Sequence, residues 1–104
     1  MPVPFAVRFQ RDPDQPAATH EWYADRTGTF TAGYWAHEGG VMECHYTEEE
    51  FCVLLDGVVR LTAEDGQTAV FRKDDGFVIP KGFKGTWETV EPVRKWYVIW
   101  QPPG

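Results

Sequence analysis

The sequence has few cysteines, few basic residues and no long apolar run. Its 104 residues contain ten Lys and Arg against sixteen Asp and Glu, which gives a net charge of −6 at pH 7. The scattered basic residues form no stripe for a phosphate backbone, so we expect no nucleic-acid partner. No apolar run approaches membrane-spanning length, so we expect no membrane partner. Cys44 and Cys52 are too few for a disulfide framework and lack zinc-type spacing, which predicts two reduced thiols.

Several common signatures are also missing. Pro2 and Pro4 interrupt the first residues, and no long apolar core follows, so we predict no signal peptide and expect a cytoplasmic protein. The chain has no phosphate-cradling glycine motif and no Ser-His-Asp arrangement. The missing motifs argue against a P-loop or Rossmann-type nucleotide-binding protein and against an enzyme with a serine nucleophile.

The composition predicts one compact domain, since 42% of the residues are hydrophobic and 15% are aromatic. Prolines concentrate in residues 1–27, which we interpret as an N-terminal arm, and residues 28–104 as a single domain. Within the arm we predict a short strand at Val7 to Phe9 and a helical turn near Thr19 to Asp25. Such an arm, together with the many aromatic residues, leads us to expect a homodimer built by sheet extension or arm packing.

From Gly28 onward the pattern is that of β-strands. Short apolar runs are bounded by Gly, Pro and Asp, and Asp65-Gly66 between two such runs is a strong hairpin signal. The predicted strands are 29–35, 41–46, 51–56, 58–63, 68–72, 77–79, 86–90 and 95–100. Turns at this spacing, with a strand–turn–strand unit on each side of the hairpin, predict an all-β antiparallel jelly roll, the double-stranded β-helix.

One stretch indicates where a site would lie. Glu50 opens an apolar run that closes on Gly57, and a carboxylate at the start of such a strand can point into a barrel. In that position it would be a candidate general acid or base. The alternative is a solvated turn carboxylate beside Glu48 and Glu49.

These residues resemble the cupin superfamily over about residues 33–100. Its first motif contains His-x-His, a glutamate three or four residues on, and a glycine after six more, and Glu50 and Gly57 fit that ending. Its second motif contains Pro-x-Gly and a histidine, where this chain has Pro80-Lys81-Gly82 and then Gly85. The longer pattern resembles the small cupins grouped with the ureidoglycine aminohydrolase cupin domain, which implies the cupin jelly roll and, loosely, small nitrogenous metabolites.

The cupin metal residues do not carry over. The His-x-His positions hold Cys44 and Tyr46 with the three-residue gap, or Glu43 and His45 with the four-residue gap. Gly85 offers no side chain, and a mononuclear transition-metal site normally takes three protein ligands. We therefore predict no bound metal and no cofactor, with an atypical metal site near Glu50 as the alternative.

The candidate catalytic residues are Glu50, Lys95 and Tyr46, and the candidate pocket residues are Cys44, Trp87 and Trp35. Lys95 matches the subfamily pattern and would pair with Glu50 or bind an anionic group, or else protect a sheet edge. The aromatic residues would line a pocket or simply fill the core, and Cys44 would do the same as a small buried hydrophobe.

Two functions remain open from the sequence. One is a small enzyme that works without a metal, with Glu50 as acid or base, on a small polar or carboxylated metabolite in a hydrolysis, elimination or isomerisation. The other is a module that binds or senses such a ligand without turnover. The fold alone does not choose between them.

Overall fold

The structure is a computed structural model that describes residues 6–13 and 19–102. Within these ranges it is all-β. The strands are β1 (Thr19–Ala24), β2 (Phe30–His37), β3 (Gly40–His45), β4 (Glu49–Ala63), β5 (Thr68–Arg72), β6 (Gly76–Ile79) and β7 (Lys84–Trp100). In these same ranges there is no helix long and apolar enough to cross a membrane.

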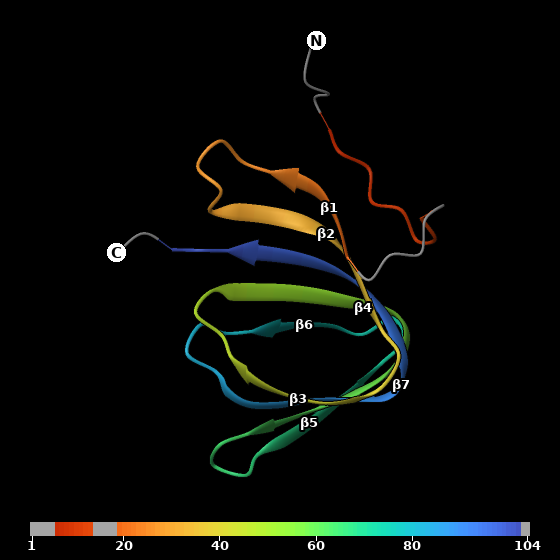
Figure 1. Cartoon of the computed structure of the whole chain (residues 1–104), viewed down its shortest axis with the longest axis vertical. Coiled ribbons are helices and arrows are strands. Elements are labelled where there is room, and N and C mark those ends of the chain that lie inside the picture. The colour runs from red at the N-terminus through yellow and green to blue at the C-terminus, as the bar shows by residue number, and fades with distance from the viewer. Residues whose placement is uncertain (1–5, 14–18, 103–104) are drawn as a thin grey trace.

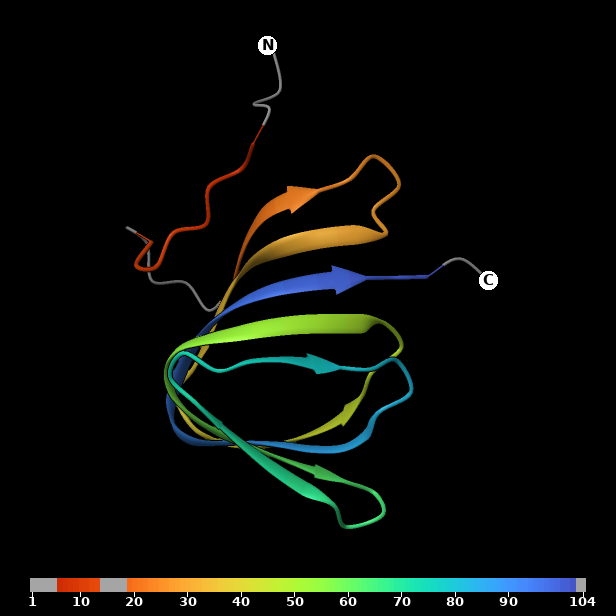
Figure 2. The ribbon, with the colours of Figure 1, turned by 180° about the vertical axis from the view of Figure 1, so that it is seen from behind.

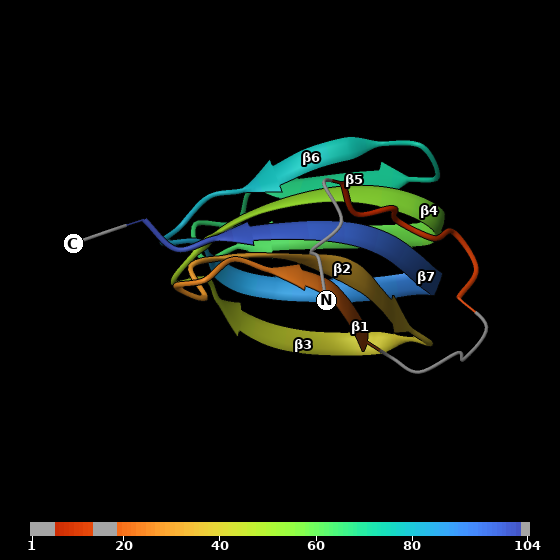
Figure 3. The same cartoon turned by 90° about the horizontal axis from the view of Figure 1, so that it is seen from above.

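All strand pairs are antiparallel, and the sheet folds over into two layers that share β4 and β7 (Figure 1). The first layer has the order β1-β2-β7-β4-β6, and the second has β3-β7-β4-β5. Both shared strands bend at one side of the molecule and return below (Figures 1 and 2), and the view from above shows the strands running in roughly the same direction (Figure 3). The predicted antiparallel jelly roll is confirmed.

The bend of β4 explains a difference from the predicted strands. We expected Gly57 to separate two strands, but β4 runs through it, with its pairing to β7 shifting between Leu54 and Val59. Gly57 has φ +94°, and a Cβ atom there would overlap the carbonyl oxygen of Pro92. Glycine therefore lets the strand pass from one layer to the other. In the same way, the predicted strands 86–90 and 95–100 are one strand, β7.

The predicted helical turn near Thr19 is wrong. Residues 19–24 form edge strand β1, which pairs with β2. Trp22 packs against Tyr34 and Tyr23 against Phe30, so aromatic contacts with β2 outweigh the capping potential of Thr19. Residues 7–9 are not in a strand, and residues 1–5 and 14–18 of the predicted arm lie outside the described residues. The division of the chain at residue 27 stays a prediction.

The core lies between the layers. Its buried members are Cys52, Leu54, Val59, Leu61, Phe77, Ile79, Trp87 and Val93. Three polar side chains, Glu50, Thr89 and Lys95, are also buried. Burying a charged group is costly unless it is paired, so the partners of Glu50 and Lys95 decide whether they belong to a site.

Candidate functional site

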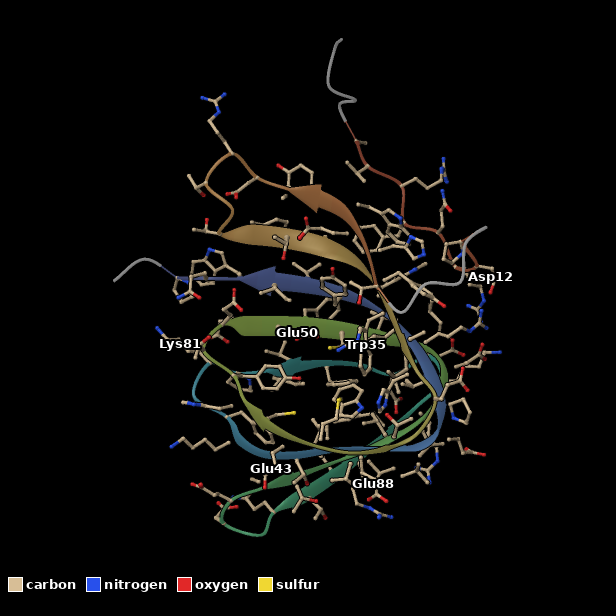
Figure 4. The ribbon with its side chains drawn as sticks, in the orientation of Figure 1. Asp12, Trp35, Glu43, Glu50, Lys81 and Glu88 are labelled. Carbon is tan, nitrogen blue, oxygen red and sulfur yellow. The ribbon has the colours of Figure 1, made fainter. Side chains whose placement is uncertain are left out.

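A pocket of about 270 Å³ opens between the layers. Its lining residues are Thr19, Trp35, Met42, Tyr46, Glu50, Trp87, Lys95, Tyr97 and Ile99. Glu50 and Trp35 lie between the two layers in Figure 4, whereas Glu43, Lys81 and Glu88 lie at the periphery. The structure thus brings Tyr46, Glu50 and Lys95 to one concave surface.

The polar end of the pocket is a buried ion pair. Lys95 on β7 donates a hydrogen bond to Glu50 Oε2 on β4 at 2.6 Å, and the two side chains are 6% and 10% exposed. Cys52, two residues beyond Glu50 on the same strand face, donates its thiol proton to the same oxygen at 3.1 Å. Lys95 Nζ also lies 3.5 Å from Cys52 Sγ. Each charge compensates the other, which keeps both ionised groups in the core.

Two tryptophans complete the surroundings of the ammonium. Lys95 Nζ lies 4.9 Å from the ring centroid of Trp35 and 4.5 Å from that of Trp87. The two indoles meet edge to face, with centroids 5.4 Å apart and planes at 88°. Their electron-rich faces attract a cation and stabilise it further where water is excluded. Lys95 is therefore held by a carboxylate, a thiol and two aromatic rings.

A second set of contacts fixes both indoles. Trp87 Nε1 donates to Thr89 Oγ1 at 2.8 Å, and Thr89 Oγ1 lies 2.7 Å from His37 Nδ1. Because the threonine oxygen already accepts the indole proton, its own hydroxyl proton can go to His37. The imidazole also stacks on Trp35, with centroids 5.1 Å apart and planes at 14°. His37 thus orients one tryptophan directly and the other through Thr89.

Glu50 keeps one oxygen for a ligand. Both hydrogen bonds that its side chain accepts from described residues go to Oε2. Oε1 receives no hydrogen bond from these two donors, and Glu50 lines both this pocket and the neighbouring hollow of about 300 Å³. The carboxylate can therefore receive a proton or a hydrogen bond from a bound molecule.

Tyr46 supplies a hydroxyl at the pocket wall. Burial, and then the negative charge of Glu50, raise the pKa of Tyr46 well above its ordinary value. The phenol therefore stays protonated and can donate a hydrogen bond. Its ring packs edge to face on Phe83 at 5.9 Å.

Cys44 does not line this pocket. It borders two neighbouring hollows, of about 540 and 300 Å³, and the smaller one also touches Tyr46 and Glu50. Burial raises the pKa of Cys44, which opposes a role as a nucleophile. Strand alternation predicts that Cys44 shares the inner face with Tyr46, and both side chains pack, partly buried, against the core.

Sequence reasoning missed several residues around the ion pair. Cys52 shares the strand face of Glu50, and Tyr97 shares that of Lys95, so alternation could have found both. Met42 and Thr19 come from strands whose register only the structure gives.

The buried thiol of Cys52 should make the stability of the fold depend on pH in the alkaline range. Burial raises its pKa to about 12. Above pH 9 the unfolded chain loses this thiol proton and the folded chain keeps it, so stability falls as pH rises. We measure the free energy of unfolding by urea titration at pH 8 and at about pH 10.5. Between these two pH values, we expect the free energy of unfolding to fall by about 2 kcal/mol more in the wild type than in a Cys52→Ala variant. Equal losses in the two proteins would show that Cys52 is not the group responsible.

The residues at the cupin metal positions do not fit a metal centre. Glu50 is paired with Lys95, while Glu43 and His45 are exposed on the other face of β3. A Cβ atom at Gly85 would overlap the carbonyl oxygen of Thr62, so no side chain fits there. Among the described residues, no three His, Cys, Asp or Glu side chains gather where they could share an ion. The absence of a bound metal stays a prediction.

Comparisons with known proteins agree with this architecture. Residues 24–97 match the family model of the EutQ-like cupin domain. A DUF861 family protein from Thermotoga maritima is 39% identical over 62% of this chain and 73% of that chain, with a TM-score of 0.60. A candidate ethanolamine utilization protein Q from Salmonella typhimurium is 23% identical over 82% and 69% of the two chains, with a TM-score of 0.72. The EutQ protein of Clostridium difficile is 16% identical over 80% and 61%, with a TM-score of 0.70. No curated protein matches in sequence.

Proposed function

Because this chain belongs to the EutQ-like cupin family, we propose that it binds a small polar or carboxylated metabolite in the pocket between its two layers. The observation that carries the proposal is the buried contact between Lys95 and Glu50 at the pocket surface. A buried ion pair is seldom the most stable way to fill a core, which favours a role in recognition over one in packing. The likeness to the ureidoglycine aminohydrolase cupin domain remains a prediction that adds nitrogenous metabolites to the candidates.

The size of the pocket limits the ligand. Its volume of about 270 Å³ lies just below the range of sites that hold drug-sized molecules. The walls are mainly aromatic and aliphatic, with few polar groups, which is the usual composition of small-ligand sites. A compact metabolite with one or two polar groups fits this description better than a nucleotide.

The polar groups are arranged for a ligand with both a donor and an acceptor. Glu50 Oε1 accepts a hydrogen bond, while the hydroxyls of Tyr46 and Thr19 and the ammonium of Lys95 donate. Lys95 already contacts Glu50, so a ligand carboxylate would share the ammonium rather than replace its partner. The aromatic rings of Trp35 and Trp87 then cover the apolar part of the ligand.

A second candidate function is catalysis without a metal. Its support is the hydrogen bond from Lys95 to Oε2, which leaves Oε1 of Glu50 to take up or release a proton at a bound molecule. Hydrolysis, elimination and isomerisation all need such an acid or base. Turnover by chelator-treated wild-type protein, lost in Glu50→Gln, would separate this function from binding alone.

The binding proposal is tested with small probes. We expect succinate, lactate, acetamide or ethanolamine to quench tryptophan fluorescence, because Trp35 and Trp87 line the pocket. Ethanolamine is included because of the name of the Salmonella relative. For any probe that binds, Glu50→Gln and Tyr46→Phe should each weaken affinity by roughly 10-fold or more, since the first removes the negative charge of the carboxylate and the second removes a hydroxyl donor.

The matched control is Glu43→Gln, which removes a carboxylate that is exposed on β3 and lies outside the pocket. Its affinity should equal that of the wild type. Calorimetry measures the dissociation constants of the probes independently of fluorescence. The proposal fails if a probe binds all of these variants equally well, since its site would then lie elsewhere.

A further inference from the structure

Lys95 differs from the other lysines of the chain in its surroundings. Lys73, Lys81 and Lys84 are exposed, whereas Lys95 is buried and lines the pocket between the layers. An exposed ammonium interacts mainly with water, but a lysine that is held in an apolar pocket can act as a nucleophile toward carbonyl compounds. Binding of a polar ligand uses only the charge of Lys95, so the chemistry of its nitrogen is left without a role.

The pairing of Lys95 with Glu50 makes the polar end of the pocket neutral overall. Lys95 Nζ lies 2.6 Å from Glu50 Oε2, and no other charged side chain of the described residues lines this pocket. The pair therefore offers a full uncompensated charge to neither an anion nor a cation. An uncharged polar group suits this end of the pocket better, and a carbonyl group is one that reacts reversibly with an amine.

The surroundings of Lys95 Nζ also suit the product of that reaction. Condensation of an amine with a carbonyl group gives an iminium ion, which keeps the positive charge on the same nitrogen. Glu50 Oε2 then remains as the counter-charge, and the rings of Trp35 and Trp87, with centroids 4.9 and 4.5 Å from Nζ, attract the cation. The low exposure of Lys95 restricts the access of water, which protects an iminium ion from hydrolysis.

The neighbouring thiol and phenol are less suited to act as the nucleophile. Cys52 Sγ lies 3.5 Å from Lys95 Nζ, but Cys52 is fully buried and does not line the pocket. Burial raises the pKa of Cys52 to about 12, so it stays a thiol. Burial also raises the pKa of Tyr46, so its hydroxyl keeps the proton and can donate a hydrogen bond to a carbonyl oxygen.

We propose that Lys95 forms an imine with the carbonyl group of a small aldehyde or ketone. This inference rests on the proposed function, since the compound must first enter the same pocket. The proton that Lys95 donates to Glu50 Oε2 moves to the carboxylate, and the freed lone pair of the nitrogen attacks the carbonyl carbon.

Glu50 carries the protons of this condensation. It takes two protons from the nitrogen in turn and passes each to the former carbonyl oxygen, which leaves as water. A C=N bond replaces the C=O bond, the nitrogen ends as an iminium ion, and Glu50 ends as the carboxylate with which it began. The net charge of the pocket is unchanged, and the step needs neither an oxidant nor a reductant.

Reductive trapping tests this step. Cyanoborohydride reduces an iminium ion to a stable secondary amine, and peptide mapping by mass spectrometry then identifies the modified lysine. With propionaldehyde or pyruvate, we expect Lys95 of the wild type to be modified at least about 10-fold faster than Lys84, which is exposed on the same strand. Modification of Lys95 no faster than Lys84 with both compounds would overturn the proposal.

A pair of arginine variants separates the imine from the charge. Lys95→Arg keeps a cation beside Glu50 but cannot form an imine, so the preferential adduct should be lost. Lys84→Arg is the matched control, and its Lys95 should be modified at the wild-type rate. Circular dichroism checks that both variants fold. If Lys95→Arg does not fold, the peptide map of the wild type decides alone.

The alcohols 1-propanol and lactate distinguish failure of the imine from failure of binding, because each carries a hydroxyl in place of the carbonyl group. Quenching of tryptophan fluorescence by either alcohol, without a trapped adduct at Lys95 from the corresponding carbonyl compound, would overturn the imine and leave the proposed binding function intact. Absence of quenching by every probe, together with absence of the adduct, would overturn both.

Discussion

Replacing Lys95 by methionine should lower the free energy of unfolding at pH 7 by about 3–5 kcal/mol. Methionine fills similar space and keeps the contacts with Trp35 and Trp87, but it leaves the Glu50 carboxylate buried without its counter-charge. The cost is that of an unpaired buried anion rather than of a lost contact. Urea unfolding followed by tryptophan fluorescence measures it.

Two variants make this result specific to the ion pair. Lys84→Met removes an exposed lysine from the same strand and should change stability by less than about 0.5 kcal/mol. Adding Glu50→Gln to Lys95→Met should recover much of the loss, since no buried charge then remains. If the double variant is as unstable as Lys95→Met, the lysine stabilises the fold through packing, and its pairing with Glu50 is incidental.

The substitution Gly85→His, which restores the histidine of the second cupin motif, should lower the free energy of unfolding by about 3–5 kcal/mol. It should create no metal site. A Cβ atom at this position overlaps the carbonyl oxygen of Thr62, so the cost begins with the first added carbon. We therefore expect Gly85→Ala to be almost as unstable as Gly85→His. Denaturant titration measures stability, and calorimetry with zinc or nickel measures metal binding.

Gly39→Ala is the matched control for this substitution. The nearest atom to a Cβ there is the carbonyl oxygen of Thr89 at 3.9 Å, which is ordinary contact. Its stability should stay within about 0.5 kcal/mol of the wild type. A Gly85→Ala variant of wild-type stability, or tight binding of a transition metal to Gly85→His, would contradict the proposed geometry.

Turn chemistry made most of the fold predictable. Asp65-Gly66 indicated a hairpin, and the structure pairs Thr62 with Thr68 across it. Gly57 was harder to interpret, because a glycine with positive φ serves equally to end a strand or to bend one. The strand bends at Gly57 because β7 passes close to it, at Pro92 and Val93. This contact is distant in sequence, so the residues around Gly57 do not predict it.

Only some residues of the site could be predicted, by the alternation of side chains along strands or by the resemblance to cupins. Alternation placed Tyr46 on the inner face, and resemblance directed attention to Glu50 and Lys95. The link from His37 through Thr89 to Trp87 joins residues about fifty positions apart, so it follows from strand register and not from any local pattern.

The central place of β7 has a consequence for how the chain folds during synthesis. β7 pairs with β2, β3 and β4, yet it is the last of the described strands to be made. Until residues 84–100 have left the ribosome, β2 and β3 have no partner within either layer apart from edge strand β1. The contact of Trp35 with Trp87 and the pairing of β2 and β3 in their layers therefore form last, through contacts that are distant in sequence and slow to form. A chaperone that shields the first six strands would act on this chain at the stage when it is most exposed to aggregation.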